Sequence, residues 1–438
     1  MQNITMAKKI IFLLILFLIC GSALLAQDGE NLTIKIAVIG PGDELYFWWG
    51  HIGLIIEDSS TGSSRFYDYG IFDFESDNFF YNFAFGRLLY RCGSSFAERN
   101  LAHYIYNNRK IVMYTLDLPL ETKIKIKEFA EHNVLPENRY YFYHHFRDNC
   151  STRIRDIIDL ATEGQFKEQY INEKSKFTLR QHVRRHTWFS PFFDWILNFW
   201  MGQVIDTPIT VWDDMFLPAE VGKKIEEFSY IDIYNQTRKL VPNEGYIETI
   251  FESQGRPAVL DIPRKQWDRQ FVFSLVLSAI FFFFFYLYSR NIKAGSYSLW
   301  RIFAGFSMSI CGLFFGIAAT LLYFLNIFTN HDYTFQNFNM IFCTPLLLVT
   351  VPIGISYALT KNPKKLIIYD ELLRIIWLLT VLGVFISMII KLFPGFYQQN
   401  LTDQMLILPI ALVFAFHPVG LRSFIKKYFI PKKADKNG

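Results

Sequence analysis

The sequence has little charge and lacks several common functional motifs. Charged residues make up 19% of the 438 residues, and the formal net charge is only +4. No basic stretch alternates with aromatic residues in a polar segment, so we expect no nucleic-acid partner. Gly-Xaa-Ser-Xaa-Gly, Walker-type and dinucleotide-binding runs are absent as well, and we expect no cofactor. Hydrophobic residues make up 51%, which excludes a disordered chain.

The first 26 residues have the pattern of a secretory signal. Lys8 and Lys9 precede the apolar run 10–19, and small residues follow as far as Ala26. Cleavage near Ala26 and retention as a signal anchor both place the following residues outside the cytoplasmic membrane. We therefore expect residues 27 onwards to form an exported domain.

Residues 27–269 contain no apolar run long enough to cross a bilayer, whereas the rest of the chain contains five. These runs are 271–288, 302–326, 339–359, 372–391 and 404–423. Lys and Arg are frequent in the first and third connections and in the tail, but absent from the second connection. The positive-inside rule then places the C-terminus in the cytoplasm and residues 27–269 in the periplasm. The prediction is a periplasmic domain at 27–269 and a five-helix transmembrane domain at 270–438 in the inner membrane.

Within the exported domain, local patterns predict an α+β fold with a helical extension. β-Branched or alternating segments predict strands at 32–39, 51–57, 65–69 and 110–118. Helical patterns cover 95–106, 121–133, 150–161 and the extension from 176 to about 200.

Two of the five cysteines, Cys92 and Cys150, lie in the exported domain. One interpretation is a disulfide between them, which an oxidising compartment would favour. The other is a nucleophile at Cys150, because Asn149 or Asp148 can cap a helix that starts there. Unpaired amides and the helix dipole stabilise a thiolate in a first helical turn, and the Cys150 amide could bind an oxyanion.

A thiolate nucleophile needs a base, and His51 is the best candidate. It opens an apolar strand directly after the aromatic run 46–49, although a purely structural histidine would fit the same position. Asp68 in the next strand could orient the imidazole, because adjacent antiparallel strands bring such side chains together. Asp58 is the competing carboxylate.

Four segments in order resemble the Lnb family of bacterial lipoprotein N-acyltransferases. They are the run 47–54 around Gly50-His51, the run 67–74 with Tyr-Asp-Tyr-Gly, Phe85-Gly-Arg-Leu-Leu-Tyr90, and the run 143–153 around Asn149-Cys150. The resemblance covers about residues 35–265. The order of His before Asn-Cys is also similar to circularly permuted papain-like and NlpC-type thiol enzymes. Asp68 stands where the family usually has Asn, so the identity of the third catalytic group stays open.

The resemblance implies acyl transfer through a thioester on Cys150, with His51 as the base. The acyl donor would be a membrane phospholipid, and the acceptor would be the N-terminal amine of a diacylated lipoprotein. Substrate-binding candidates are Asn149, the flanking cations Arg147 and Arg153, and the aromatic residues Trp48 and Trp49 near the bilayer surface. Arg147 and Arg153 could equally be solvated surface cations.

Two other functions remain possible from the sequence. The same Cys-His pair could serve a membrane-anchored hydrolase of cell-wall peptides or lipids, or a disulfide-closed domain could act as a receptor or scaffold. His182 and His186 have helical i, i+4 spacing, but the residues between them supply no Glu and two cations. We therefore expect no metal site.

Overall fold

The computed structural model describes residues 31–72, 78–265, 268–290 and 298–419, which form two compact units. The first unit takes residues up to 77 together with 88–174 and 210–256. The second takes 78–87, 175–209 and the residues from 257 onwards. The predicted signal segment and the basic C-terminal tail lie outside the described residues.

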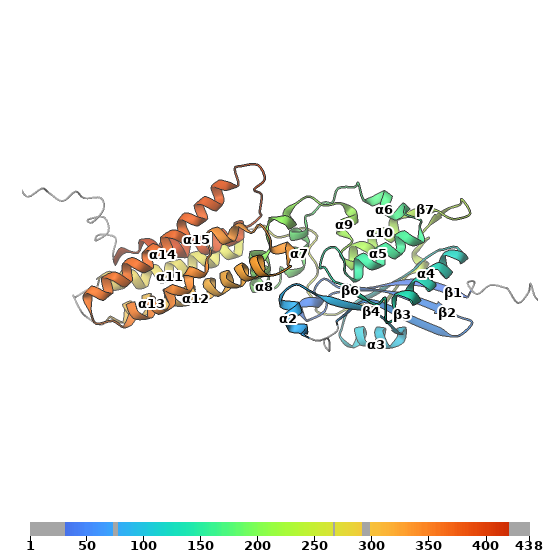
Figure 1. Ribbon diagram of the computed structural model, residues 1–438, viewed down its shortest axis with the longest axis horizontal. Helices are drawn as coiled ribbons and strands as arrows, with labels where there is room; N and C mark the ends of the chain where they lie inside the picture. The colour runs from blue at the N-terminus through green and yellow to red at the C-terminus, as the bar shows by residue number, and fades with distance from the viewer. Residues whose placement is uncertain (1–30, 73–77, 266–267, 291–297, 420–438) are drawn as a thin grey trace, which may run out of the picture. The chain divides into compact units, whose positions relative to one another are not determined.

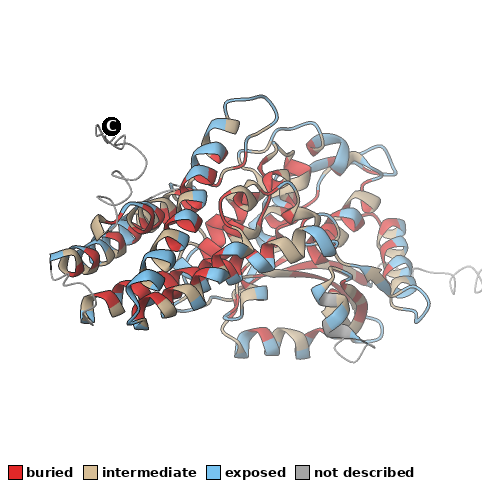
Figure 2. Cartoon of the chain, turned by 60° about the vertical axis from the view of Figure 1, so that its left-hand side comes forward, coloured by how far each residue is buried: buried red, intermediate tan, exposed pale blue. Residues whose placement is uncertain are grey.

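The first unit is built on a seven-stranded antiparallel sheet with the order β6-β4-β3-β2-β1-β5-β9. The strands are β1 (Leu32–Ile39), β2 (His51–Asp58), β3 (Ser63–Phe72), β4 (Leu89–Phe96), β5 (Ile111–Thr115), β6 (Tyr140–Phe142) and β9 (Ile247–Phe251). A separate hairpin pairs β7 (Ser229–Ile231) with β8 (Thr237–Lys239). The central strands are largely buried, as the colouring of Figure 2 shows.

Helices cover both faces of the sheet (Figure 1). On one face lie α4 (Leu120–Asn133), α5 (Cys150–Ala161) and α10 (Pro218–Glu227), and on the other lies α3 (Ala97–Tyr106). The short helices α6 (Gln165–Tyr170) and α9 (Val211–Asp214) complete the first face. Alternation along β1 explains the two layers, because Ile34 and Ile36 point into the larger core while Ala37 and Ile39 point into the smaller one.

The predicted α+β fold of this region is confirmed. The bounds of β1 and α5 agree with the sequence prediction, and β2, β3, β5, α3 and α4 lie where strands and helices were expected. The sequence analysis missed β4, which lies between β3 and β6 in the sheet. Its residues Cys92-Gly-Ser-Ser95 are small, and they interrupt the alternation that marks a half-buried strand.

The second unit is helical and contains three helices apolar and long enough to cross a membrane. These candidate spans are Arg269–Arg290, Leu299–Phe328 and Pro363–Ile390, and the helices that carry them are α11 (Asp268–Arg290), α12 (Leu299–Phe328) and α14 (Pro363–Ile390). Large apolar side chains on these helices are exposed, such as Ile310 and Phe328, each 64% exposed. Such a surface is typical of helices that face lipid.

The other two predicted spans form shorter helices, α13 (Thr350–Leu359) and α15 (Leu401–Phe416). The first half of the run 339–359 folds instead as the 3-10 turns η5 (Phe338–Ile341) and η6 (Pro345–Val349). Pro345 contributes to the break, because it has no amide hydrogen and restricts the residue before it. The five-helix count therefore stays a prediction.

The predicted helix from 176 to 200 is two helices, α7 (Leu179–Thr187) and α8 (Pro191–Trp200), and both belong to the second unit. Pro191 sits in the first turn of α8, where its missing amide costs nothing. Trp195 and Phe199 are buried in the core of the apolar helices, and Trp195 stacks on Phe314 with 5.0 Å between ring centroids. These two aromatic residues of α8 are therefore part of the core of the second unit.

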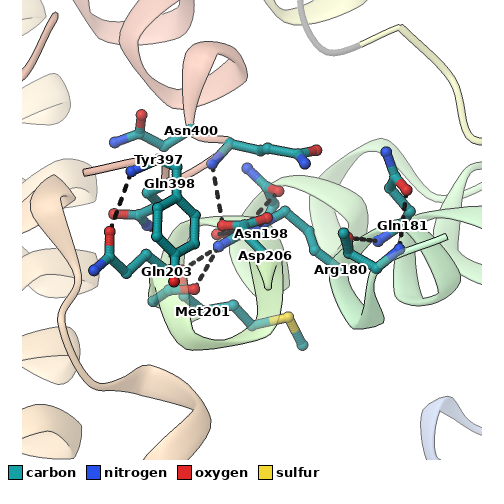
Figure 3. A network of polar contacts seen from close by, with 12 residues as sticks. Arg180, Gln181, Asn198, Met201, Gln203, Asp206, Tyr397, Gln398 and Asn400 are labelled. Atoms are coloured by element: carbon teal, nitrogen blue, oxygen red, sulfur yellow. Dashed lines mark hydrogen bonds and ion pairs between the residues drawn. The ribbon is translucent and has the colours of Figure 1, made fainter. Parts of the chain in front are cut away.

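A buried polar network ties these two helices to the loops of the same unit (Figure 3). The guanidinium of Arg180 bonds the Asp206 carboxylate at 2.8 Å and donates to the carbonyls of Met201 and Gly202. The other Asp206 oxygen accepts from the Gln399 amide, and the Asn198 amide donates to the carboxylate of Asp403 in α15. Both charged side chains of the Arg180–Asp206 pair are almost fully buried. Loss of either one would therefore leave the other as a buried charge without its counter-ion. The small helix α2 (Phe79–Ala84) also belongs to this unit.

Candidate active site

Sheet register brings His51 and Asp68 together at one end of the first unit's sheet. Asp68 pairs with Gly53, so it lies diagonally across from His51 on the same face of β2 and β3. The His51 Nε2 atom is 3.1 Å from Asp68 Oδ1, which also accepts the Gly70 amide at 2.8 Å. Asp58 lies at the opposite end of β2 and bonds Ser60. The structure thus supports Asp68 over Asp58 as the orienting carboxylate.

The pair favours a charged imidazole. Burial by itself lowers the pKa of His51, but Tyr104, the Asp68 carboxylate and the Cys150 thiolate favour the imidazolium, and the pKa is raised well above its usual value. Burial by itself raises the pKa of Asp68, but the imidazolium and the Gly70 amide outweigh it and lower that pKa. Because Asp68 occupies Nε2, Nδ1 is the imidazole nitrogen left for exchanging a proton with a thiol.

Cys150 is the first residue of α5, as the sequence predicted, and it is 9% exposed. The side-chain oxygen of Asn149 accepts hydrogen bonds from the backbone amides of Ser151 and Thr152 at 2.8 and 2.9 Å. The Thr152 hydroxyl in turn accepts a hydrogen bond from the backbone amide of Asn149. This reciprocal capping box fixes the start of the helix. Within the described residues the Cys150 amide donates no hydrogen bond, so it is available to an oxyanion beside the sulfur.

Gly70 fills the space between His51 and Cys150. A Cβ atom on Gly70 would lie 2.8 Å from His51 Cε1 and 3.5 Å from Cys150 Cβ. The imidazole and the cysteine side chain therefore flank the same small volume. Pairing between β3 and β4 shifts register between Asp68 and Ile71, and this irregularity places Gly70 there. Histidine, carboxylate and thiol thus form one cluster at the end of the sheet.

Both cysteines of this unit are free thiols, so the structure does not contain the alternative Cys92–Cys150 disulfide. Cys92 lies inside β4, and burial raises its pKa to about 12. A thiol with such a pKa stays protonated at neutral pH and is a poor nucleophile. The geometry therefore favours Cys150 as the reactive thiol of the pair.

The predicted substrate-binding residues lie close to His51 or Cys150 in the sequence, and they differ in exposure. Arg147 is exposed, whereas Arg153 is half-buried and forms a two-pronged ion pair with Asp148 at 2.6 and 2.7 Å. Trp48 is buried, and its indole donates to the Asp43 carbonyl. Trp49 is half-buried.

Asn149 is only 4% exposed, and its side chain is fully used inside the domain. Besides capping α5, its amide nitrogen donates to the carbonyls of His145 and Phe216 at 2.8 and 3.0 Å. These contacts give Asn149 a role in positioning the helix that carries Cys150. Its predicted role in binding substrate stays a prediction.

Sequence reasoning missed two residues that pack against the cluster. Tyr104 of α3 lies with its ring centroid 6.1 Å from that of His51, and burial raises its pKa to about 12. Arg109, in the connection after α3, is 1% exposed and packs against Tyr104. The segment 95–110 has a helical pattern but no motif, so only the folded sheet reveals that its end approaches His51.

His182 and His186 lie in α7 of the second unit, where Nδ1 of His186 bonds the His182 carbonyl. Across the ranges that the structure describes, no three His, Cys, Asp or Glu side chains are grouped to hold a metal ion.

Fold and site together define a membrane protein whose α+β domain carries a Cys, His and Asp cluster, with apolar candidate spans in the same chain. Residues 24–185 match the family model of the Lnb N-terminal periplasmic domain. Residues 24–185 therefore carry an Lnb N-terminal periplasmic domain, and the resemblance found in the sequence is confirmed for this part. No curated protein and no solved structure matches the chain.

Proposed function

We propose that the protein is a lipoprotein N-acyltransferase of the bacterial inner membrane, with its catalytic domain in the periplasm and its C-terminus in the cytoplasm. The observation that carries the proposal is the cluster itself. Cys150 at a capped helix N-terminus and His51 bonded to Asp68 flank one small volume beside Gly70. This arrangement has the parts of a thiol acyltransferase: nucleophile, base, orienting group and a backbone oxyanion donor.

The first half-reaction forms a thioester. His51 takes the proton of Cys150, and the resulting thiolate attacks an ester carbonyl of a membrane phospholipid. The Cys150 amide binds the oxyanion of the tetrahedral intermediate. When the intermediate collapses, the ester C–O bond breaks, His51 returns the proton to the leaving alkoxide, and a lysophospholipid departs.

The second half-reaction transfers the acyl group to nitrogen. The free N-terminal amine of a diacylglyceryl-cysteine lipoprotein attacks the thioester carbonyl, and His51 accepts the amine proton. The C–S bond then breaks, the amide forms and the thiol of Cys150 is restored with that proton. The product is a triacylated lipoprotein, and no redox partner is needed at any step.

The apolar helices support a lipid substrate for this chemistry. Donor and acceptor both reside in the bilayer, and a domain held in the same chain as candidate spans meets them at high local concentration. A hydrolase of soluble cell-wall peptides would gain nothing from such an attachment. The papain-like permutation and the five-helix topology belong to this proposal as expectations.

The decisive experiment is mass spectrometry of a lipoprotein's N-terminal peptide from cells that depend on this protein. Cys150→Ala and His51→Ala should leave a folded membrane protein that produces only the diacylated peptide. Cys92→Ala is the matched control, because it removes the neighbouring buried thiol and should retain triacylation. Normal triacylation with Cys150→Ala would exclude the mechanism, and release of free fatty acid without transfer would favour a lipid hydrolase.

A further inference from the structure

The sheet places Arg109 at the same end as the catalytic cluster. Ile39 at the end of β1 pairs with His51 on one side and with Ile111 on the other, so these three residues form one row across the sheet. Arg109 lies two residues before Ile111, on the β5 side of this row. Its amide bonds the Tyr104 carbonyl at 3.0 Å, and its Nε bonds the Gly40 carbonyl at 3.0 Å. Both ends of the residue are therefore fixed.

The charge of Arg109 has no carboxylate partner. The side chain is 1% exposed, yet it forms no ion pair with any residue in the described ranges. The guanidinium carbon lies 4.4 Å from the ring centroid of Phe47 and 5.2 Å from that of Tyr104. Aromatic stacking covers a guanidinium and leaves the N–H groups at its edge available.

One of those edge groups is unsatisfied. Nη2 of Arg109 is buried and has no hydrogen-bond partner within the described residues. A buried guanidinium that lacks a counter-ion and leaves one N–H group without an acceptor is costly, so it indicates a ligand that the folded chain does not supply itself. Burial lowers the pKa of Arg109, and Tyr104, Cys150 and Glu44 are among the groups that favour its charge. The unpaired cation thus lies in the electrostatic field of the reactive thiol.

We propose that Arg109 binds the phosphate of the acyl donor and thereby positions the donor's ester at Cys150. This inference rests on the proposed acyltransferase function and adds a residue that selects phosphate-bearing lipids. A phosphate suits the site because its oxygens accept charge-assisted hydrogen bonds from the in-plane N–H groups of a guanidinium. Arg153, one of the two flanking cations predicted to bind substrate, already has its charge paired with Asp148, whereas Arg109 forms no ion pair within the described residues.

The first test measures binding without acyl transfer. Full-length protein in detergent is alkylated with N-ethylmaleimide at increasing concentrations of sn-glycerol 3-phosphate, and modification of the Cys150 peptide is followed by mass spectrometry. Glycerol phosphate should slow alkylation of Cys150 saturably in the wild type, while the buried Cys92 should stay unmodified and thereby report that the protein remains folded. Loss of a charge-assisted contact in Arg109→Gln should weaken this protection roughly tenfold or more.

Two further variants separate the role of Arg109 from general charge and from folding. Lys110→Gln removes the adjacent cation, which is exposed and paired with Glu252, and should protect like the wild type. Arg109→Lys keeps the charge and should keep part of the protection. Equal protection in the wild type and Arg109→Gln would overturn the proposal. Absence of protection in the wild type would overturn it as well, and that measurement does not depend on any variant folding.

The second test uses acyl transfer from a phospholipid and from a diacylglycerol with the same acyl chains. The wild type should prefer the phospholipid, and Arg109→Gln should reduce the ratio of the two kcat/KM values roughly tenfold, chiefly through KM for the phospholipid. An equal fall in kcat for both donors would assign Arg109 to the reacting oxyanion and contradict the phosphate role. Protection by glycerol phosphate without any N-acylation would refute the transfer function and leave the anion site standing.

Discussion

The capping residue Asn149 offers a prediction that can be worked out in free energy. Its side chain makes four hydrogen bonds: two from the amides of Ser151 and Thr152, and two to the carbonyls of His145 and Phe216, of which only the bond to His145 is part-buried. Asn149→Ala removes the cap, which costs about 0.5–2 kcal/mol. It also leaves the His145 and Phe216 carbonyls without these donors, at about 1 kcal/mol each. The expected total is about 3 kcal/mol.

Hydrogen exchange of the α5 amides measures this loss where it occurs. A local destabilisation of about 3 kcal/mol raises the open population roughly 100-fold, so exchange across Cys150–Ala161 should accelerate by a similar factor. Asn149→Ser keeps an oxygen for the cap and loses only the two donors, and it should fall between the wild type and Asn149→Ala. Asn133→Ala is the matched control, because Asn133 bonds only the Phe129 carbonyl at the exposed end of α4.

Reactivity of the thiol should follow the cap. A frayed first turn no longer aims its dipole and amides at Cys150, so alkylation of Cys150 should slow in Asn149→Ala. Unchanged exchange in α5 would refute the capping argument. If the only effect were a raised KM for the lipid donor, Asn149 would bind substrate, as the sequence analysis proposed.

Three further predictions concern charge, shape and burial. The His51–Asp68 pair stabilises the fold fully below the ordinary imidazole pKa of about 6.5 and above the ordinary carboxyl pKa of about 3.9. That stability is lost as pH rises through the raised pKa of His51 or falls through the lowered pKa of Asp68. In a plot of the thermal unfolding midpoint against pH, Asp68→Asn should therefore show a smaller decrease than the wild type at both the acidic and the alkaline end. Gly70→Ala places a Cβ 2.8 Å from the His51 ring and should reduce acyl transfer about 100-fold with an unchanged circular dichroism spectrum; full activity would show that the ring can move. Arg180→Met leaves the buried Asp206 carboxylate unpaired at a cost of about 3–5 kcal/mol, and a thermal midpoint equal to the wild type would contradict the importance of that network.

The sequence predicted the members of the cluster better than their surroundings. A capping residue before a periodic helix marked Cys150, and a histidine opening an apolar strand marked His51, because both signals are local. Asp68 could be proposed only because adjacent strands pair, and Asp58 stayed open until the register was known. Local patterns do not contain register, which depends on the turn and on the packing of both faces.

Arg109 and Tyr104 show the limit more clearly. Nothing in the pattern of α3 and the connection after it distinguishes them from other polar and aromatic side chains, and their position depends on β5 pairing with β1 rather than with β4. The predicted five-helix count stays unconfirmed for a related reason. Hydropathy reports composition and not backbone conformation, so it did not reveal that part of the run 339–359 folds as 3-10 turns.

The two free thiols have a consequence for how the protein matures. On the proposed function, the chain is exported unfolded into a compartment whose oxidants join exposed thiols, and a bridge from Cys92 to Cys150 would consume the proposed nucleophile. In the folded domain Cys92 is 3% exposed and Cys150 9%, so completion of the sheet and docking of α5 end that exposure. The yield of active protein should then depend on whether the sheet and α5 assemble before oxidation joins the two thiols.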